Sequence, residues 1–232
     1  EEQIVSNIKL YESMLACMNV LKENNLSKKT VVLMYQNNID FIIAFLACIA
    51  LKVIAVPAYP PKSKQHSERI NNILANSNTS TICTTTKIKN LIGNKKQFSS
   101  IDQNIQWLAT DSFLYQKNAK NRKFHNEKNT VAFLQYTSGS TSKPKGVMVS
   151  NENILNNCHD IKTLFGINHK SVSMSWAPNF HDMGLIYGIL TPIYCCIPSI
   201  IMEPSTFIRT PLSWLKMIDK YKVTHSGAPN FA

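Results

Sequence analysis

The sequence lacks an apolar run long enough to cross a bilayer. The longest candidate, Phe41 to Leu51, covers about half of the roughly 18 to 20 residues that a membrane-spanning helix needs. The N-terminus, "EEQIVSNIKL", is acidic and has neither the basic nor the apolar region of a signal peptide. We therefore expect no transmembrane segment and predict a soluble, cytoplasmic protein.

The sequence also lacks the cysteine spacing of a metal or redox site. Its six cysteines include no C-x-x-C pair, and most of them lie in apolar surroundings. This pattern favours buried free thiols in a reducing compartment over disulfides, and it predicts no metal site. The adjacent Cys195 and Cys196 are expected at the end of a helix.

Glycine is scarce, with seven residues in 232, and no segment repeats, which excludes propellers and solenoids. The formal net charge of +11 suits anionic ligands. However, the basic stretches "PPKSKQHSER", "KIKNLIGNKKQ" and "QKNAKNRKFHNEKN" lack the interleaved aromatic residues of a base-stacking surface. We expect solvated loops and no nucleic-acid partner.

Short β-branched runs alternate with amphipathic stretches along the first part of the chain. The sequence predicts strands at 30–35, 53–61 and 79–86, and helices at 38–52 and 67–78. The strand at 53–61 is expected to be stopped by its prolines. Strands that alternate with helices pair in parallel through helical crossovers. The prediction is an α/β fold of layered sheets with helical crossovers.

The composition also suggests a division of the chain. Residues 1–116 are expected to form a first α/β lobe, residues 117–129 a basic, Asn-rich linker, and residues 130–232 a second α/β segment. In that segment two strands, "TVAFLQYT" and "GVMVS", flank a loop. Ser150 is then expected to cap a helix over 151–165, with Glu152 in its first turn and Gly166 closing it.

The loop is "YTSGSTSKPKG", Tyr136 to Gly146. Its hydroxyl groups, the backbone N–H groups of a glycine-rich turn and its two lysines suit phosphate oxygens. It is not a Walker A motif, because Lys145 directly precedes Gly146 and a strand follows. Composition alone fits a flexible surface loop equally well.

The stretch "YTSGSTSKPKGVMVS" resembles the phosphate loop of the adenylate-forming superfamily, which includes acyl-CoA synthetases, luciferases and peptide-synthetase adenylation domains. Three more stretches, "VIAVPAYPP", "SWAPNFHDMGLIYGILTPIY" and "SGAPNFA", are more similar to fatty acyl-AMP ligases than to CoA ligases. The resemblance covers nearly the whole chain. It implies a partial N-terminal domain of the acyl-CoA synthetase-like fold, truncated before the rest of the AMP-binding domain.

The resemblance also implies an activity. A fatty acid carboxylate attacks the α-phosphorus of ATP, pyrophosphate leaves, and the acyl-adenylate is later passed to the thiol of an acyl carrier protein, with Mg²⁺ accompanying ATP. By position, His181 is the implied catalytic residue, and Asp182, Gly184, Pro229 and Asn230 are implied to bind the substrate. The residues implied to hold the phosphates of ATP are Thr137, Ser138, Gly139, Ser140, Thr141, Lys143, Lys145 and Gly146.

Taken without the resemblance, these residues have ordinary structural interpretations. A histidine at a helix start is often a hydrogen-bonding residue, and Asp182 either fixes its tautomer or caps the helix 183–194. Gly184 and Gly188 either allow a close helix contact or line an acyl tunnel. Pro229 and Asn230 fit an ordinary turn.

The sequence leaves two other functions open. One is an acyl-CoA synthetase, and the other is a non-catalytic binding module that retains the phosphate loop. The family's adenine and ribose segments, its hinge and its C-terminal catalytic lysine have no match in these residues. We therefore interpret the chain as the N-terminal portion of such a ligase and expect the 232 residues alone to be inactive.

Overall fold

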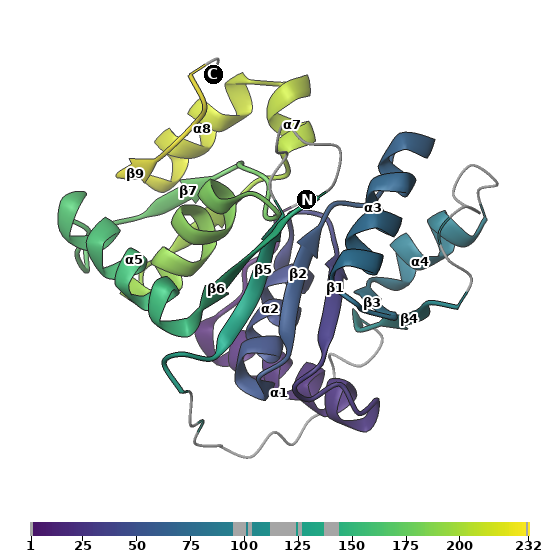
Figure 1. The fold of residues 1–232 in the computed structure, drawn as a ribbon. Helices are drawn as coiled ribbons and strands as arrows, with labels where there is room; N and C mark the ends of the chain where they lie inside the picture. The colour runs from purple at the N-terminus through teal and green to yellow at the C-terminus, as the bar shows by residue number, and fades with distance from the viewer. Residues whose placement is uncertain are drawn as a thin grey trace. The chain divides into compact units, whose positions relative to one another are not determined.

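A computed structural model describes residues 2–94, 101, 104–111, 124, 127–136, 144–230 and 232 (Figure 1). The chain divides into two compact units. Unit 1 comprises Glu1–Tyr35 and Ile39–Val149, and unit 2 comprises Gln36–Asn38 and Ser150–Ala232. Each unit has its own sheet.

Unit 1 is built on a six-stranded sheet in the order β4-β3-β1-β2-β5-β6. Parallel pairing joins β1 to β2 and β3, β2 to β5, and β3 to β4. The strands are β1 (Thr30–Met34), β2 (Ile54–Ala58), β3 (Thr81–Thr84), β4 (Gln106–Ala109), β5 (Val131–Tyr136) and β6 (Gly146–Ser150). The predicted α/β fold with parallel strands and helical crossovers is thus confirmed.

Pro57 lies inside β2, opposite Leu33, so this strand continues past its first proline and ends at Ala58.

Helices cover both faces of this sheet. They are α1 (Asn7–Glu23), α2 (Ile39–Leu51), α3 (Lys64–Asn76) and α4 (Thr86–Gly93). Because side chains alternate along a strand, Val32 and Met34 join the cluster formed with α3 and α4. The other face meets α2, where the Phe45 ring lies 5.6 Å from that of Phe133, and α1 packs on α2.

Four of the six cysteines are buried, and all six are free thiols, as expected. Cys17, Cys48 and Cys83 lie in the core of unit 1 at α1, α2 and β3. Burial raises the pKa of Cys17 to about 12 and raises the pKa values of Cys48 and Cys83 as well. Cys195 ends α6, and the exposed Cys196 follows it in the left-handed conformation, at a helix end as predicted.

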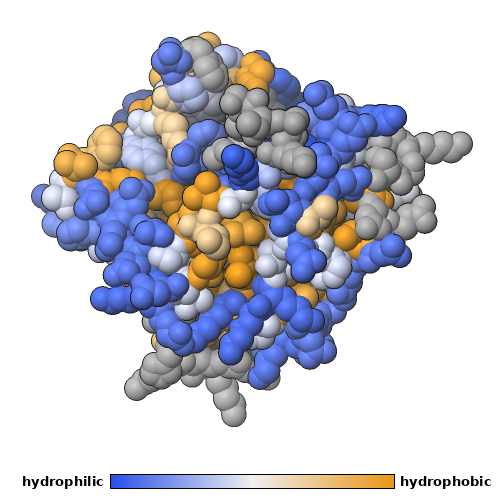
Figure 2. All heavy atoms as spheres, viewed as in Figure 1, coloured by the Kyte–Doolittle hydropathy of each residue, from blue (hydrophilic) through white to orange (hydrophobic). Residues whose placement is uncertain are grey.

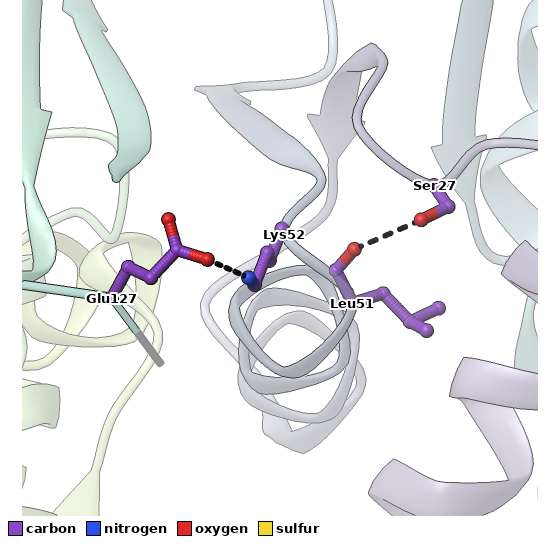
Figure 3. A network of polar contacts seen from close by, with 4 residues as sticks. All are labelled: Ser27, Leu51, Lys52 and Glu127. Atoms are coloured by element: carbon purple, nitrogen blue, oxygen red, sulfur yellow. Dashed lines mark hydrogen bonds and ion pairs between the residues drawn. The ribbon is translucent and has the colours of Figure 1, made fainter. Parts of the chain in front are cut away.

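The linker predicted at 117–129 lies mostly outside the described residues. Among its described residues, Glu127 is held at the end of α2, where Lys52 Nζ donates to Glu127 Oε1 over 2.6 Å (Figure 3). This hydrogen bond and the lysine charge lower the pKa of Glu127.

Contacts divide the chain near Ser150, so β5 and β6, expected in the second lobe, belong to unit 1. The linker itself stays a prediction.

Unit 2 contains a three-stranded parallel sheet in the order β8-β7-β9. Its strands are β7 (Ser173–Ser175), β8 (Ser199–Ile201) and β9 (His225–Ser226), and its helices are α5 (Asn151–Leu164), η3 (Met183–Leu190), α6 (Thr191–Cys195), α7 (Pro204–Arg209) and α8 (Leu212–Tyr221). Figure 1 shows α7 and α8 on one side of this sheet and α5 on the other. On the first side, Trp176 stacks on Phe207 with ring centroids 3.9 Å apart.

Helix α5 begins and ends as its sequence predicts. Ser150 Oγ accepts a hydrogen bond from Asn153 N, and Ser150 N in turn donates to Asn153 Oδ1, which forms a capping box. At the other end Gly166 has φ +64°, and Gly166 N donates to Thr163 O. A glycine there ends the helix without the steric cost that a Cβ would add.

The helix predicted over 183–194 is present, but its first part is wound differently. Met183–Leu190 forms a π-helix, and an α-helix follows only from Thr191. A Cβ on Gly184 would lie 2.1 Å from Pro178 O, and one on Gly188 would lie 2.5 Å from Ser175 Oγ. Both glycines therefore allow η3 to pack against residues 175–178, which supports the close-contact interpretation.

Not every large apolar side chain is buried. Ile208, Leu212 and Leu215 of α7 and α8 are exposed, and Figure 2 shows apolar side chains between hydrophilic ones on the face in view. Among the described residues, no helix combines the length and the apolar character needed to span a bilayer.

We predict that Gly184→Ala destabilises unit 2. The new methyl group would overlap backbone oxygens that cannot move away as a flexible side chain can, so overpacking should cost about 1–3 kcal/mol or more. Urea unfolding followed by tryptophan fluorescence measures the effect. Gly93→Ala is the control: nothing lies within 4 Å of its Cβ position, and we expect a gain of about 0.4–1 kcal/mol. Equal stability of the two variants would contradict this packing.

We predict that the thiols differ sharply in reactivity. The thiolate is the reactive form, so at pH 8 exposed Cys196 should be alkylated at least about 100-fold faster than buried Cys17, Cys48 or Cys83. Iodoacetamide labelling and peptide mass spectrometry provide the measurement, with urea-unfolded protein as the reference in which all six react. Rapid labelling of any of these three thiols in the native protein would show that the core of unit 1 is open.

Candidate functional site

The predicted phosphate loop connects β5 to β6, as expected from its flanking strands. Its phosphate-binding candidates Thr137, Ser138, Gly139, Ser140, Thr141 and Lys143 lie outside the described residues, so their roles stay predictions. The described residues at its two ends are Tyr136 and Pro144–Gly146.

These two ends of the loop lie against each other. Tyr136 is the last residue of β5, and Gly146 is the first residue of β6. A Cβ on Gly146 would lie only 2.9 Å from Cζ of the Tyr136 ring. The Tyr136 hydroxyl donates to Asn76 Oδ1 over 2.6 Å, which ties the ring to α3. Gly146 is therefore needed for the closed base of the loop, whatever the loop binds.

The charge at this base is positive. Lys145 is exposed beside Gly146, so its ammonium group is accessible to an anion. Burial raises the pKa of the Tyr136 phenol, which keeps this hydroxyl neutral and able to donate. An exposed lysine at the base of a hydroxyl-rich loop suits the phosphates of ATP chemically.

His181 and Asp182 lie in unit 2, at the start of η3. His181 N donates to Pro178 O over 3.0 Å, and Leu185 N donates to His181 O over 2.9 Å. The main chain of His181 thus connects a tight turn to the first turn of the helix. Its side chain is exposed, so the imidazole is accessible to a ligand.

Asp182 makes both of the contacts that its sequence position suggested. Its Oδ1 accepts a hydrogen bond from Met183 N over 2.6 Å and caps η3. The same oxygen lies 2.6 Å from His181 Nδ1. When Nδ1 donates to this carboxylate, the neutral imidazole presents Nε2 as an acceptor, and the protonated ring presents Nε2 as a donor. The pair is exposed, so it contributes little to stability and mainly orients the ring.

The other candidate residues lie near the same helix. Gly184 packs on the carbonyl groups of Ala177 and Pro178. A Cβ on Gly227 would lie 3.0 Å from both Met183 Cε and Tyr187 Cε1, so the segment before Pro229 runs beside η3.

Pro229 and Asn230 form a turn that Ala232 N closes by donating to Pro229 O. Their predicted contact with substrate stays a prediction.

Two buried asparagines in this region were missed at the sequence level. Asn179, only 1% exposed, donates from Nδ2 to Gln36 O over 2.9 Å. Asn37 donates from Nδ2 to Met202 O over 2.9 Å. The sequence carries no local signal for either role, because each partner is more than a hundred positions away along the chain.

No cluster of three His, Cys, Asp or Glu side chains within the described ranges is arranged to hold a metal ion. The Mg²⁺ expected to accompany ATP stays a prediction.

Comparisons with known proteins identify relatives for this arrangement. Residues 3–231 match the AMP-binding enzyme family. The chain is 38% identical over 205 residues to the medium-chain-fatty-acid–[acyl-carrier-protein] ligase JamA of Moorena producens, covering 87% of this chain and 35% of the relative. It is 31% identical over 252 residues to the ligase TtuA of Teredinibacter turnerae, with coverages of 88% and 38%.

A solved structure is also similar. It is the fatty acyl-adenylate ligase from L. pneumophila in complex with acyl adenylate and pyrophosphate, with a TM-score of 0.86 and 36% identity, and the match covers 100% of this chain and 40% of that chain. The chain therefore spans well under half the length of these relatives. The resemblance to adenylate-forming enzymes and the partial fold inferred from the sequence are confirmed. The chain belongs to the AMP-binding enzyme family.

Proposed function

We propose that the full-length protein activates a fatty acid as its acyl-adenylate, with release of pyrophosphate, for later transfer to the thiol of an acyl carrier protein. The names of JamA and TtuA, both fatty acid–[acyl-carrier-protein] ligases, support this reaction and this acceptor. The similar structure that contains acyl adenylate and pyrophosphate supports the adenylate step. We keep the cytoplasm as the predicted location.

The observation that carries the proposal is the loop "YTSGSTSKPKG", closed at its base by Tyr136 and Gly146. In this proposal, the hydroxyl and backbone N–H groups of Thr137 to Thr141 hold the β and γ phosphates of ATP, and Lys143 and Lys145 neutralise their charge. Adenylyl transfer depends mainly on such positioning and charge neutralisation. Mg²⁺ would share this task with the lysines.

His181 would act where the acyl carboxylate meets the α-phosphate. The contact between Asp182 and Nδ1 would hold the imidazole in one orientation and leave Nε2 accessible to a ligand. A protonated Nε2 donor stabilises negative charge on an adjacent carboxylate or phosphate oxygen. Gly184, Pro229 and Asn230 would border the fatty acid.

The test is fatty-acid-dependent ATP–pyrophosphate exchange by the natural full-length protein. We expect exchange that requires a fatty acid, followed by transfer to holo acyl carrier protein in preference to CoA. Preference for CoA would favour an acyl-CoA synthetase. ATP binding without exchange would overturn the proposal in favour of a binding module.

Loss of the loop's donors should abolish most of the activity. We predict that combining Ser138→Ala, Thr141→Ala and Lys145→Met lowers the exchange rate by about 100-fold or more, because each lost donor weakens the stabilisation of phosphate charge. Steady-state exchange over a range of ATP concentrations measures the effect. Lys87→Met, at an exposed lysine of α4, is the control for lost charge. Unchanged ATP affinity and rate in the triple variant would remove the loop from the site.

Two substitutions at Asp182 should separate its two contacts. Asparagine is also a good N-cap residue, so Asp182→Asn should keep η3 capped while losing the carboxylate partner of His181. We expect nearly unchanged stability and an exchange rate about 10-fold lower or more. Asp182→Ala loses both contacts, and its stability should fall by about 0.5–2 kcal/mol. A wild-type rate for Asp182→Asn across the pH profile would show that this contact does not serve catalysis.

A further inference from the structure

A pair of buried side-chain amides in unit 2 connects backbone segments that are distant in the sequence. We call it the amide clip, defined by Asn37 and Asn179, which are 5% and 1% exposed. Asn37 Nδ2 donates to Ala177 O over 3.3 Å and to Met202 O over 2.9 Å. In return, Asn179 Nδ2 donates to Gln36 O over 2.9 Å. Residues 36–37 and 177–179 are therefore bonded in both directions.

A carboxylate completes the clip. Asn37 N donates to Glu203 Oε2 over 2.8 Å. Glu203 is also the N-cap residue of α7, yet its side chain makes no capping hydrogen bond to that helix. The carboxylate thus contacts Asn37 and does not cap its own helix. Three separate segments of unit 2, residues 36–37, 177–179 and 202–203, therefore meet at Asn37.

The clip is costly in one respect. Asn37 Oδ1 is buried, with no hydrogen-bond partner among the described residues. An unsatisfied buried acceptor costs about 1–3 kcal/mol, so an apolar side chain would be the cheaper choice if filling space were the only requirement. What the amide uniquely supplies is two N–H donors that bind two backbone carbonyl groups at once.

The clipped segment leads directly to His181. Ala177 O is bonded by Asn37, and Pro178 O accepts from His181 N. Gly184 of η3 also packs against both of these carbonyl groups. The backbone of Ala177 and Pro178 therefore contacts both the clip and the helix, and the position of His181 depends on it.

We propose that Asn37 and Asn179 are positioning residues for His181, fixing the turn that places its imidazole for adenylate formation. This inference rests on the proposed function. Neither asparagine would contact the substrate. Their effect would be on the rate of the chemical step, since a misplacement of about 1 Å can cost about 100-fold in rate.

The test is Asn37→Asp in the full-length protein. The new side chain has the same shape, but its carboxylate cannot donate to the carbonyl groups of Ala177 and Met202. We expect kcat for exchange to fall by about 10- to 100-fold, with the KM values for ATP and fatty acid within about 3-fold of wild type. Asn179→Ser, which loses only the contact with Gln36, should show a smaller change of the same kind and serves if Asn37→Asp does not fold.

The matched control is Thr79→Val. Thr79 is buried, and its hydroxyl donates to Thr30 O at the opposite end of β1. This variant also loses a buried hydrogen bond to a backbone carbonyl, but far along the strand from residues 36–38. It should lose stability without losing kcat. An equal loss of kcat in the control, or wild-type kcat in both asparagine variants, would overturn the inference.

A readout independent of turnover is the NMR signal of the His181 ring. In the wild type, the Nδ1–H should show the downfield proton shift of a hydrogen bond to Asp182, and in Asn37→Asp this signal should move or broaden. An unchanged signal together with unchanged kcat would overturn the inference. If the wild-type protein shows no ATP–pyrophosphate exchange, the proposed function is overturned. A shifted Nδ1–H signal in Asn37→Asp would still support the effect of the clip on His181.

Discussion

The geometry of the candidate site in unit 2 depends on the close approach of η3 to the carbonyl groups of Ala177 and Pro178. Only a residue without a Cβ fits at Gly184, because a methyl group would lie 2.1 Å from Pro178 O. This contact fixes the start of η3, and with it the turn at His181 and the cap at Asp182. The orientation of the imidazole then follows, because one carboxylate oxygen serves both Met183 N and His181 Nδ1.

The same principle applies at the base of the predicted phosphate loop, in unit 1. The loop's last glycine lies against the ring of the tyrosine that precedes the loop, and the tyrosine hydroxyl is bonded to α3. Loop residues that bind phosphate must be held in place before the ligand arrives, since positioning supplies much of the catalysis. In both units a glycine allows two backbone segments or a ring to pack closely, and a hydrogen bond or ion pair orients the side chain beside it.

Sequence reasoning succeeded where the determining interactions are local. Apolar periodicity located β1, α2 and α3, and Ser150 with Gly166 set the ends of α5. It failed where distant residues decide. No local pattern indicated the π-helical winding of η3, which packs on residues 175–178, and β5 joins the first sheet by pairing with β2. Asn37 bonds a carbonyl 140 positions away, so no local pattern could indicate its role.

The most direct test is a crystal structure of the full-length protein with acyl-adenylate and pyrophosphate bound. We expect residues 137–145 to surround the pyrophosphate and His181 Nε2 to lie within hydrogen-bond distance of the phosphate group of the acyl-adenylate. We also expect Asp182 still to contact His181 Nδ1 and Asn37 still to donate to Ala177 O. Pyrophosphate bound away from this loop, or His181 directed away from the adenylate, would contradict these expectations.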